Sequence, residues 1–177
     1  YFSNNPQLKE NRRDIHFRFL DIVVPMVTDD GVFSKEGLDI GTESLLKVLV
    51  TQNLGSRIFD LGCGIGSIGV ILSKTFHNIT VDGVDVNERA VSCAKENYSR
   101  HDVMGTLSVN DGVNGQYDTI VSNPPIRVGK EKLYELFDEI YNALSKNGQY
   151  FSVIRKSHGA KSAQKKCEDL FGLCELL

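Results

Sequence analysis

Apolar segments with the spacing of strands and helices alternate along most of this chain, and this alternation most constrains its fold. We expect short buried strands at residues 57–61, 80–86, 106–110, 117–122 and 149–154. Helical stripes flank them at residues 42–50, 67–76, 87–98 and 131–145, followed by a last helix that carries Ala163, Cys167, Leu170 and Phe171. Thr42 and Asn87 are the candidate N-caps. Since such an order requires right-handed crossovers, it predicts an α/β fold, a mostly parallel twisted sheet with helices on both faces.

The residues before this alternation follow a different pattern. From Ile15 to Phe33 the spacing of apolar residues predicts an N-terminal β-hairpin that ends at the Asp29-Asp30-Gly31 turn, with Pro25 on an edge. Residues 1–13 are polar, and we expect a flexible tail there. No internal repeat or Pro/Gly-rich linker divides residues 14–177, which we expect to form a single domain.

The composition of the 177 residues excludes several classes of protein. Hydrophobic residues make up 41% and charged residues 24%, which is typical of a globular domain and not of a disordered chain. No apolar run approaches the ~18 residues that a membrane helix needs. The net charge of -3 excludes a uniformly basic nucleic-acid binder. The four cysteines show no CxxC spacing, so we expect no metal site, reduced thiols and a cytoplasmic location.

A glycine-rich loop follows the first strand of the alternation, as Asp60-Leu61-Gly62-Cys63-Gly64-Ile65-Gly66. Ligands of parallel sheets bind beyond the carboxyl ends of the strands, where this loop is expected. Gly64, Gly66 and Gly69 also satisfy G-x-G-x-x-G, the dinucleotide fingerprint, so an NAD-dependent oxidoreductase is one hypothesis. The carboxylate of Asp60 argues against it, because a carboxylate beside the loop repels a pyrophosphate and favours a cationic ligand.

Two further acidic residues lie at the ends of the next two predicted strands. Asp85, with Val86 beside it, comes nineteen residues after Gly66, an offset at which a carboxylate accepts hydrogen bonds from ribose hydroxyls. This indicates a ligand that contains a nucleoside, and it is compatible both with a dinucleotide and with a cationic ligand. Asp111 and Gly112 follow the third strand, and an isolated Asp-Gly pair is more often only a turn.

The fourth strand ends at Asn123-Pro124-Pro125. Two successive prolines fix φ and remove two donors, which leaves rigid carbonyl acceptors in this loop. The side chain of Asn123 adds an amide oxygen. Such a set of acceptors suits a ligand NH2 group that has to be oriented.

These motifs resemble those of class I S-adenosylmethionine-dependent methyltransferases. The D-x-G-x-G-x-G loop resembles their first motif, and Asn-Pro-Pro resembles the (D/N/S)PP(Y/F/W) motif of the members that methylate exocyclic or amide nitrogens. The resemblance implies a Rossmann-like fold and S-adenosyl-L-methionine as cofactor. It implies that the cofactor is bound by Asp60, Gly62, Cys63, Gly64, Gly66, Asp85, Val86, Asp111, Gly112 and Asn123. As catalytic groups it implies Asn123 and Pro124, whose side-chain and carbonyl oxygens would accept hydrogens from the target amine.

A longer resemblance points to the acceptor. Residues 30–41, 126–130 and 155–160 look like segments of the small-domain family of ribosomal RNA guanine-N2 methyltransferases, single-domain type. This implies substrate-binding roles for Phe33, Pro125, Ile126, Arg127, Lys130, Arg155 and Lys156. Ile126 replaces the usual aromatic residue, for which Phe33 is our candidate substitute. Class I members end in an antiparallel hairpin, of which Cys174–Leu177 would supply only the beginning, so we expect this hairpin to be incomplete.

The charge distribution agrees with an RNA partner. Residues 126–166 hold nine Lys/Arg against four acidic residues in a chain that is acidic overall. We therefore expect ribosomal RNA or the small ribosomal subunit as partner, no membrane, and a monomer or weak dimer. Alternatively, the lysines at 161, 165 and 166 form only a solvated helix face. The acceptor could also be a protein glutamine amide or an adenine amine, and a non-catalytic RNA-binding module is a further alternative.

Overall fold

The computed structural model describes residues 11–32, 37–123, 129–154 and 159–176. Strands and helices alternate from α1 onward, as predicted. The strands are β1 (Arg13–Phe19), β2 (Ile22–Thr28), β3 (Arg57–Leu61), β4 (Thr80–Asp85), β5 (Leu107–Val109), β6 (Tyr117–Ser122) and β7 (Leu144–Ser152). The helices are α1 (Ile40–Leu49), α2 (Ser67–Thr75), α3 (Glu88–Arg100), α4 (Lys130–Ala143) and α5 (Ala160–Phe171).

The larger sheet has the strand order β5-β4-β3-β6-β7, and every pair in it is parallel. The chain moves outward from β3 through β4 to β5, then returns to the other side of β3 to form β6. The order therefore reverses between β3 and β6, where the loops that follow the two strands diverge and leave room for a ligand. The predicted α/β fold with a parallel sheet is confirmed.

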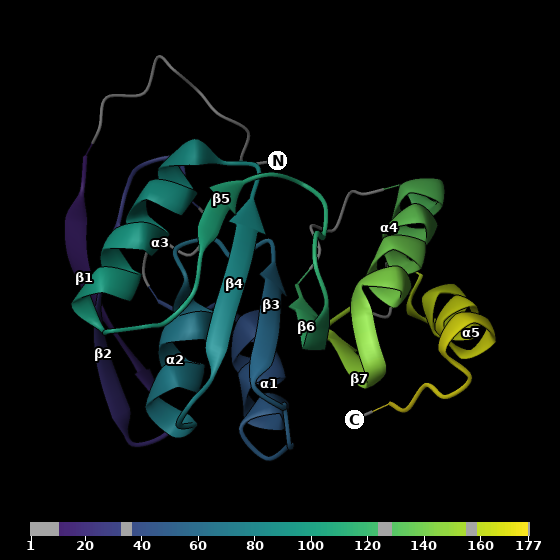
Figure 1. The fold of residues 1–177 in the computed structure, drawn as a ribbon. Coiled ribbons are helices and arrows are strands. Elements are labelled where there is room, and N and C mark those ends of the chain that lie inside the picture. Colours follow the sequence, from purple (N-terminus) through teal and green to yellow (C-terminus); the bar gives the residue numbers. More distant parts are fainter. Residues whose placement is uncertain (1–10, 33–36, 124–128, 155–158, 177) are drawn as a thin grey trace.

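Helices cover both faces of this sheet (Figure 1). Side chains alternate between the faces along each strand, so that Ile58 joins the core beneath α1, α2 and α3, whereas Phe59 joins the core beneath α4 and α5. Val81 and Val84 divide between the two cores in the same way. Both cores are apolar and buried, which fixes the register of the strands and thereby the positions of their ends.

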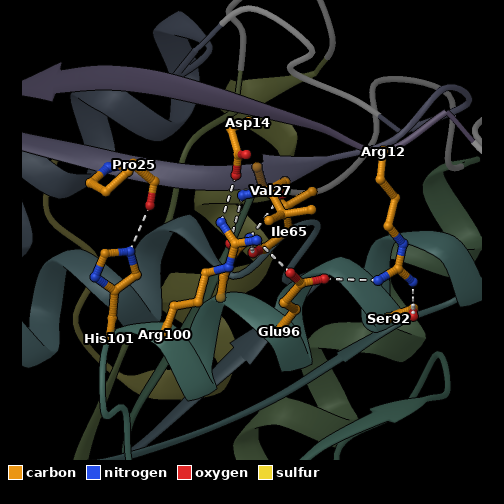
Figure 2. A network of polar contacts seen from close by, with 10 residues as sticks. Arg12, Asp14, Pro25, Val27, Ile65, Ser92, Glu96, Arg100 and His101 are labelled. Carbon is orange, nitrogen blue, oxygen red and sulfur yellow. Dashed lines mark hydrogen bonds and ion pairs between the residues drawn. The ribbon is translucent and has the colours of Figure 1, made fainter.

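The predicted N-terminal hairpin is a separate antiparallel sheet of β1 and β2. It lies outside α3, on the side of the molecule away from α4 and α5 (Figure 1). Pro25 pairs with His16 in this two-stranded ribbon, where both strands are edges, as expected. His101 Nε2 lies 2.6 Å from the Pro25 carbonyl oxygen and so ties β2 to the end of α3 (Figure 2).

Charged side chains add contacts between the hairpin and α3. Arg100 forms ion pairs with Asp14 and Glu96, and Arg12 contacts Glu96 and Ser92 (Figure 2). Arg12 lies inside the predicted tail of residues 1–13, and β1 already begins at Arg13. Residues 1–10 of that tail lie outside the described residues.

Two predicted helix boundaries were wrong. The N-cap of α1 is Asp39, not Thr42, because the Asp39 carboxylate accepts hydrogen bonds from the backbone N–H groups of Gly41 and Thr42. Helix α4 ends at Ala143, and β7 begins at Leu144, five residues before the predicted strand. Pairing with β6 extends β7 in this direction, and Ser145 Oγ donates to the Tyr117 carbonyl oxygen.

Residues 173–176 follow α5 without forming a strand. The expected start of a C-terminal hairpin at Cys174 is therefore absent from the described residues. None of the helices described is both long and apolar enough to cross a membrane.

Candidate active site

The glycine-rich loop after β3 turns back over the end of β4. The backbone N–H groups of Gly62 and Cys63 both donate to the Val84 carbonyl oxygen, at 2.8 and 2.9 Å. Gly62 and Gly64 have φ values of +82° and +54°, in the left-handed region that glycine adopts without strain. A Cβ atom built on either residue meets no atom within 4 Å. The loop therefore presents an open, side-chain-free backbone surface at the carboxyl edge of the sheet.

Gly66 and Gly69 have a different role. A Cβ atom on Gly66 would lie 3.0 Å from the Tyr98 ring, and one on Gly69 would overlap the Tyr98 hydroxyl. Both glycines thus allow the buried Tyr98 of α3 to pack against α2. In the G-x-G-x-x-G fingerprint the second glycine lets the backbone approach a pyrophosphate, but the corresponding Gly66 packs against Tyr98, and this weakens the dinucleotide hypothesis.

Asp85 ends β4 and holds the loop in place. Its Oδ2 accepts from the backbone N–H of Gly64 at 2.9 Å, and its Oδ1 accepts from Asn87 at 2.9 Å. A carboxylate has about four lone-pair sites, so Asp85 retains acceptor capacity for a ligand. Its side chain is half-buried, beside the exposed Val86. The two residues form a polar and an apolar patch next to the glycine loop.

Asp60 is the unusual group in the site. Its side chain is 1% exposed, and neither carboxylate oxygen has a hydrogen-bond partner among the described residues. Burial, and secondarily the charge of Asp85, raises the pKa of Asp60 to about 7. A buried carboxylate without partners is costly, and a cationic ligand with N–H donors would compensate it.

Asp111 and Gly112 follow β5 at the same edge of the sheet. Asn110 accepts hydrogen bonds from the backbone N–H groups of both residues, at 2.8 and 3.4 Å, so the pair belongs to a local turn. The Asp111 side chain is exposed. Its carboxylate is therefore accessible beyond the end of β5, next to the strand that carries Asp85.

Asn123 follows β6, and its side chain contacts the N-terminus of α1. Its Nδ2 lies 3.2 Å from Asp39 Oδ1 and 3.1 Å from Thr42 Oγ1. A Cβ atom on Gly41 would lie 3.1 Å from the same Nδ2, so a side chain at Gly41 would crowd Asn123. The first turn of α1 therefore supports the amide of Asn123 from one side.

The sequence does not predict this supporting role of Asp39 and Thr42. Asp39 belongs to the segment that carries the family resemblance, and Thr42 is the predicted N-cap of the helix. A sequence signal was present, since Asp, Gly and Thr occupy the first turn of a helix at capping positions. That Asn123 lies against this turn follows only from the packing of α1 next to the end of β6.

Several predicted residues lie outside the described residues, namely Phe33, Pro124, Pro125, Ile126, Arg127, Arg155 and Lys156. Lys130, which is also predicted to bind the substrate, is the first residue of α4. Lys166 forms an ion pair with Asp138 across α4 and α5, which accords with a helix-face role for this lysine. Among the described residues, no group of His, Cys, Asp and Glu has a geometry that could hold a metal ion.

Comparisons with known proteins match this arrangement to a family. A family model, the methyltransferase small domain, matches residues 23–177. The chain belongs to the methyltransferase small domain family. This membership confirms the identification as a class I methyltransferase that uses S-adenosylmethionine.

Relatives of this methyltransferase differ in length. It is 33% identical to the uncharacterized protein YbxB of Bacillus subtilis, over 97% of this chain and 88% of the relative. It is also 33% identical to the ribosomal RNA small subunit methyltransferase C of Haemophilus influenzae, over 62% of this chain but only 34% of that protein.

Solved structures share the fold of this methyltransferase. A 16S rRNA N2 methyltransferase of T. thermophilus, in complex with AdoMet and guanosine, superimposes with a TM-score of 0.79 at 22% identity. The match covers 94% of this chain and 47% of the other. A methyltransferase of Pyrococcus furiosus gives a TM-score of 0.61 at 23% identity. At these identities the likeness establishes a shared fold.

Proposed function

We propose that this methyltransferase transfers a methyl group from S-adenosyl-L-methionine to the exocyclic N2 amine of a guanine in small-subunit ribosomal RNA. The observation that carries the proposal is the position of Asn123. Its amide nitrogen is held by Asp39 and Thr42, which leaves its amide oxygen to accept a hydrogen bond from an amine. The proposal includes a cytoplasmic location, and ribosomal RNA or the small subunit as partner.

The residues at the carboxyl edge of the sheet fit the cofactor. Its amino-acid end carries an ammonium group and a sulfonium, which complement the buried, unpartnered carboxylate of Asp60. The open backbone at Gly62 and Gly64 accommodates close approach of that end. Asp85 would accept hydrogen bonds from the ribose hydroxyls, and Asp111 would accept one from the adenine amine. Val86 offers apolar surface to the base.

Catalysis in this scheme consists of positioning. When bound, S-adenosyl-L-methionine would supply a methyl group on a sulfonium for direct in-line displacement: the N–C bond to the target amine forms as the S–C bond breaks, S-adenosylhomocysteine leaves, and the amine releases one proton to solvent. The amide oxygen of Asn123, together with the Pro124 carbonyl, orients the amine and limits delocalisation of its lone pair into the ring. Holding two reactants in line contributes up to ~7–11 kcal/mol, so the chemistry requires no metal or covalent nucleophile.

The choice of acceptor rests on several supports. The Haemophilus influenzae relative is named a ribosomal RNA small subunit methyltransferase, and the T. thermophilus structure contains guanosine. Nine Lys/Arg against four acidic residues between residues 126 and 166 provide phosphate contacts. This chain spans about a third of the Haemophilus protein, so RNA recognition by the present chain is part of what must be tested.

The test is to incubate the protein with isotopically labelled S-adenosyl-L-methionine and unmodified small-subunit RNA, free and assembled. Mass spectrometry then identifies the labelled nucleoside. We expect N2-methylguanosine, abolished by Asn123→Ala and retained by Asn142→Ala, an exposed control near the end of α4 distant from the site. Label on adenosine would overturn the acceptor. No label in RNA but label on a protein glutamine would support the amide alternative.

A further inference from the structure

The side-chain amide of Asn123 faces two oxygen atoms of α1. Its Nδ2 is 3.2 Å from Asp39 Oδ1 and 3.1 Å from Thr42 Oγ1. Thr42 Oγ1 in turn lies 2.5 Å from Asp39 Oδ2. The three side chains thus form a closed triangle at the carboxyl edge of the sheet, in which each touches the other two.

The hydrogen atoms available determine the direction of each bond. An ionised Asp39 only accepts hydrogen bonds, so the single hydroxyl hydrogen of Thr42 is donated to it. Thr42 Oγ1 therefore has only lone pairs to offer to Asn123. If the amide of Asn123 were reversed, its oxygen would face two acceptors with no hydrogen between them. The triangle accordingly admits one orientation of the amide, with Nδ2 toward α1.

We propose that Asp39 and Thr42 are positioning residues that fix Asn123 as a pure hydrogen-bond acceptor toward the substrate. This inference rests on the proposed function of Asn123. Both N–H groups of the amide are used within the triangle, so only Oδ1 remains for a ligand. The group that receives the methyl must then donate a hydrogen bond, as an amine or amide NH2 does. A substrate oxygen that carries no hydrogen cannot form a hydrogen bond with Asn123.

A second role of Asp39 has to be separated from this one. Asp39 also caps α1 through the N–H groups of Gly41 and Thr42. Asn is as good an N-cap as Asp, so Asp39→Asn keeps the cap. The introduced amide, however, can donate to Thr42 Oγ1, which frees the threonine hydrogen to bond Asn123 Oδ1. The substitution therefore weakens the selection of one amide orientation while leaving α1 intact.

The first experiment needs no substrate. The side-chain amide signals of 15N-labelled protein are recorded, and Asn123→Ala identifies the pair that belongs to Asn123. We expect these two protons to exchange with solvent about tenfold faster or more in Asp39→Asn and in Thr42→Val. Ser44→Ala is the control, since Ser44 lies on the same turn, is exposed and donates only to the Ile40 carbonyl. Equal exchange rates in the wild type and in the variants Asp39→Asn, Thr42→Val and Ser44→Ala would overturn the proposal.

The second experiment measures turnover with the acceptor identified above. We expect kcat to fall about tenfold or more in Asp39→Asn and Thr42→Val, with affinity for S-adenosylhomocysteine within about twofold of wild type. A loss of cofactor affinity or of melting temperature parallel to kcat would indicate a structural role instead. If the wild type shows no turnover on RNA, the proposed function fails, and the exchange measurement still decides the role of Asp39 and Thr42.

A reciprocal exchange provides a rescue test. In Asn123→Asp, two carboxylates face each other across the triangle, and we expect kcat to fall. Adding Asp39→Asn removes one of the two charges, and its amide donates to Thr42 Oγ1, which frees the threonine hydrogen for the carboxylate at position 123. The double variant should therefore recover part of the lost kcat. A double variant that is no better than Asn123→Asp alone would contradict direct coupling between positions 39 and 123.

Discussion

The carboxylate of Asp85 accepts a hydrogen bond from the backbone N–H of Gly64, with 2.9 Å between Oδ2 and N. The two residues lie 21 positions apart in the sequence: Asp85 ends β4, and Gly64 lies in the loop that follows β3, the parallel neighbour of β4. Asp85 was predicted as a ribose ligand, and this bond gives it a second task. It holds the glycine loop in its turned-back position and so links the two proposed halves of the cofactor site.

Asp85→Ala should therefore weaken cofactor binding in two ways, by removing an acceptor for the ribose and by releasing the loop. We expect the Kd for S-adenosylhomocysteine to rise by about tenfold or more, which isothermal titration calorimetry would measure. Asp21→Ala, at the exposed turn of the hairpin, is a matched control. An unchanged Kd in Asp85→Ala would exclude Asp85 from the cofactor site.

The stability of the ligand-free protein should depend on Asp60. Its pKa rises from 3.8 to about 7 on folding, so between these values the folded state binds a proton that the unfolded state has lost. The free energy of unfolding then falls by about 1.4 kcal/mol per pH unit for this group, and the full penalty applies above about pH 7. Asp60→Asn removes this penalty, since an amide carries no charge.

We therefore expect Asp60→Asn to raise the melting temperature of the ligand-free protein, more at pH 8 than at pH 5. The same variant should bind S-adenosylhomocysteine more weakly, because the ammonium loses its carboxylate partner. Thermal denaturation at both pH values, with and without ligand, measures both effects. A stability difference independent of pH would show that the Asp60 carboxylate is not destabilising in the folded state.

The glycines of the loop should separate into two groups. Gly69→Ala places a methyl group against the Tyr98 hydroxyl, and we expect a loss of about 1–3 kcal/mol in stability from overpacking. Gly62→Ala meets no atom of the protein, so only its positive φ costs stability, about 1–2 kcal/mol. Its main effect should be on cofactor affinity. Chemical denaturation and ligand titration of both variants test this division. Equal losses of cofactor affinity in the two variants would contradict it.

Asn97 should be essential for docking of the hairpin. It is fully buried, and its side chain bonds both the N–H and the carbonyl of Val27 in β2, as well as the carbonyl of Ile65 in the glycine loop. Asn97→Leu leaves these three backbone groups without partners, at about 1–3 kcal/mol each. We expect a loss of at least ~3 kcal/mol in chemical denaturation.

The half-buried neighbour Glu96 offers the control for this prediction. Glu96 lies on the same helix as Asn97, and Glu96→Gln removes its ion pairs with Arg12, which precedes β1, and with Arg100 of α3. This loss should cost less than about 1 kcal/mol. Hydrogen exchange at the Val27 amide should accelerate in Asn97→Leu and not in Glu96→Gln. Comparable losses in the two variants would mean that Asn97 contributes no more than a surface contact.

The sequence predicted the strands better than the ends of the helices. Strands 57–61 and 117–122 agree with the structure, because both are short, apolar and bounded by polar residues. The start of β7 at Leu144 was missed, since Leu144 also continues the apolar stripe of α4. Its extended conformation depends on pairing with Tyr117 of β6, a residue 27 positions earlier, which no local pattern reveals.

What the sequence determined by itself is the alternation of elements and the motifs at their ends. Periodicity encodes which face of each element is buried, and glycines and prolines encode where the backbone turns, so the parallel fold and the polar residues at its carboxyl edge were predictable. Only the tertiary structure decided which of these residues touch. The hydrogen bonds between Gly64 and Asp85 and between Asn123 and Asp39 arise from side-by-side packing of distant segments. The same packing buries the Asp60 carboxylate with no hydrogen-bond partner in the part of the chain that the structure describes. A hydrogen bond forms only when the distance between its two atoms is right to within a few tenths of an ångström. The spacing of residues along the chain does not contain that information.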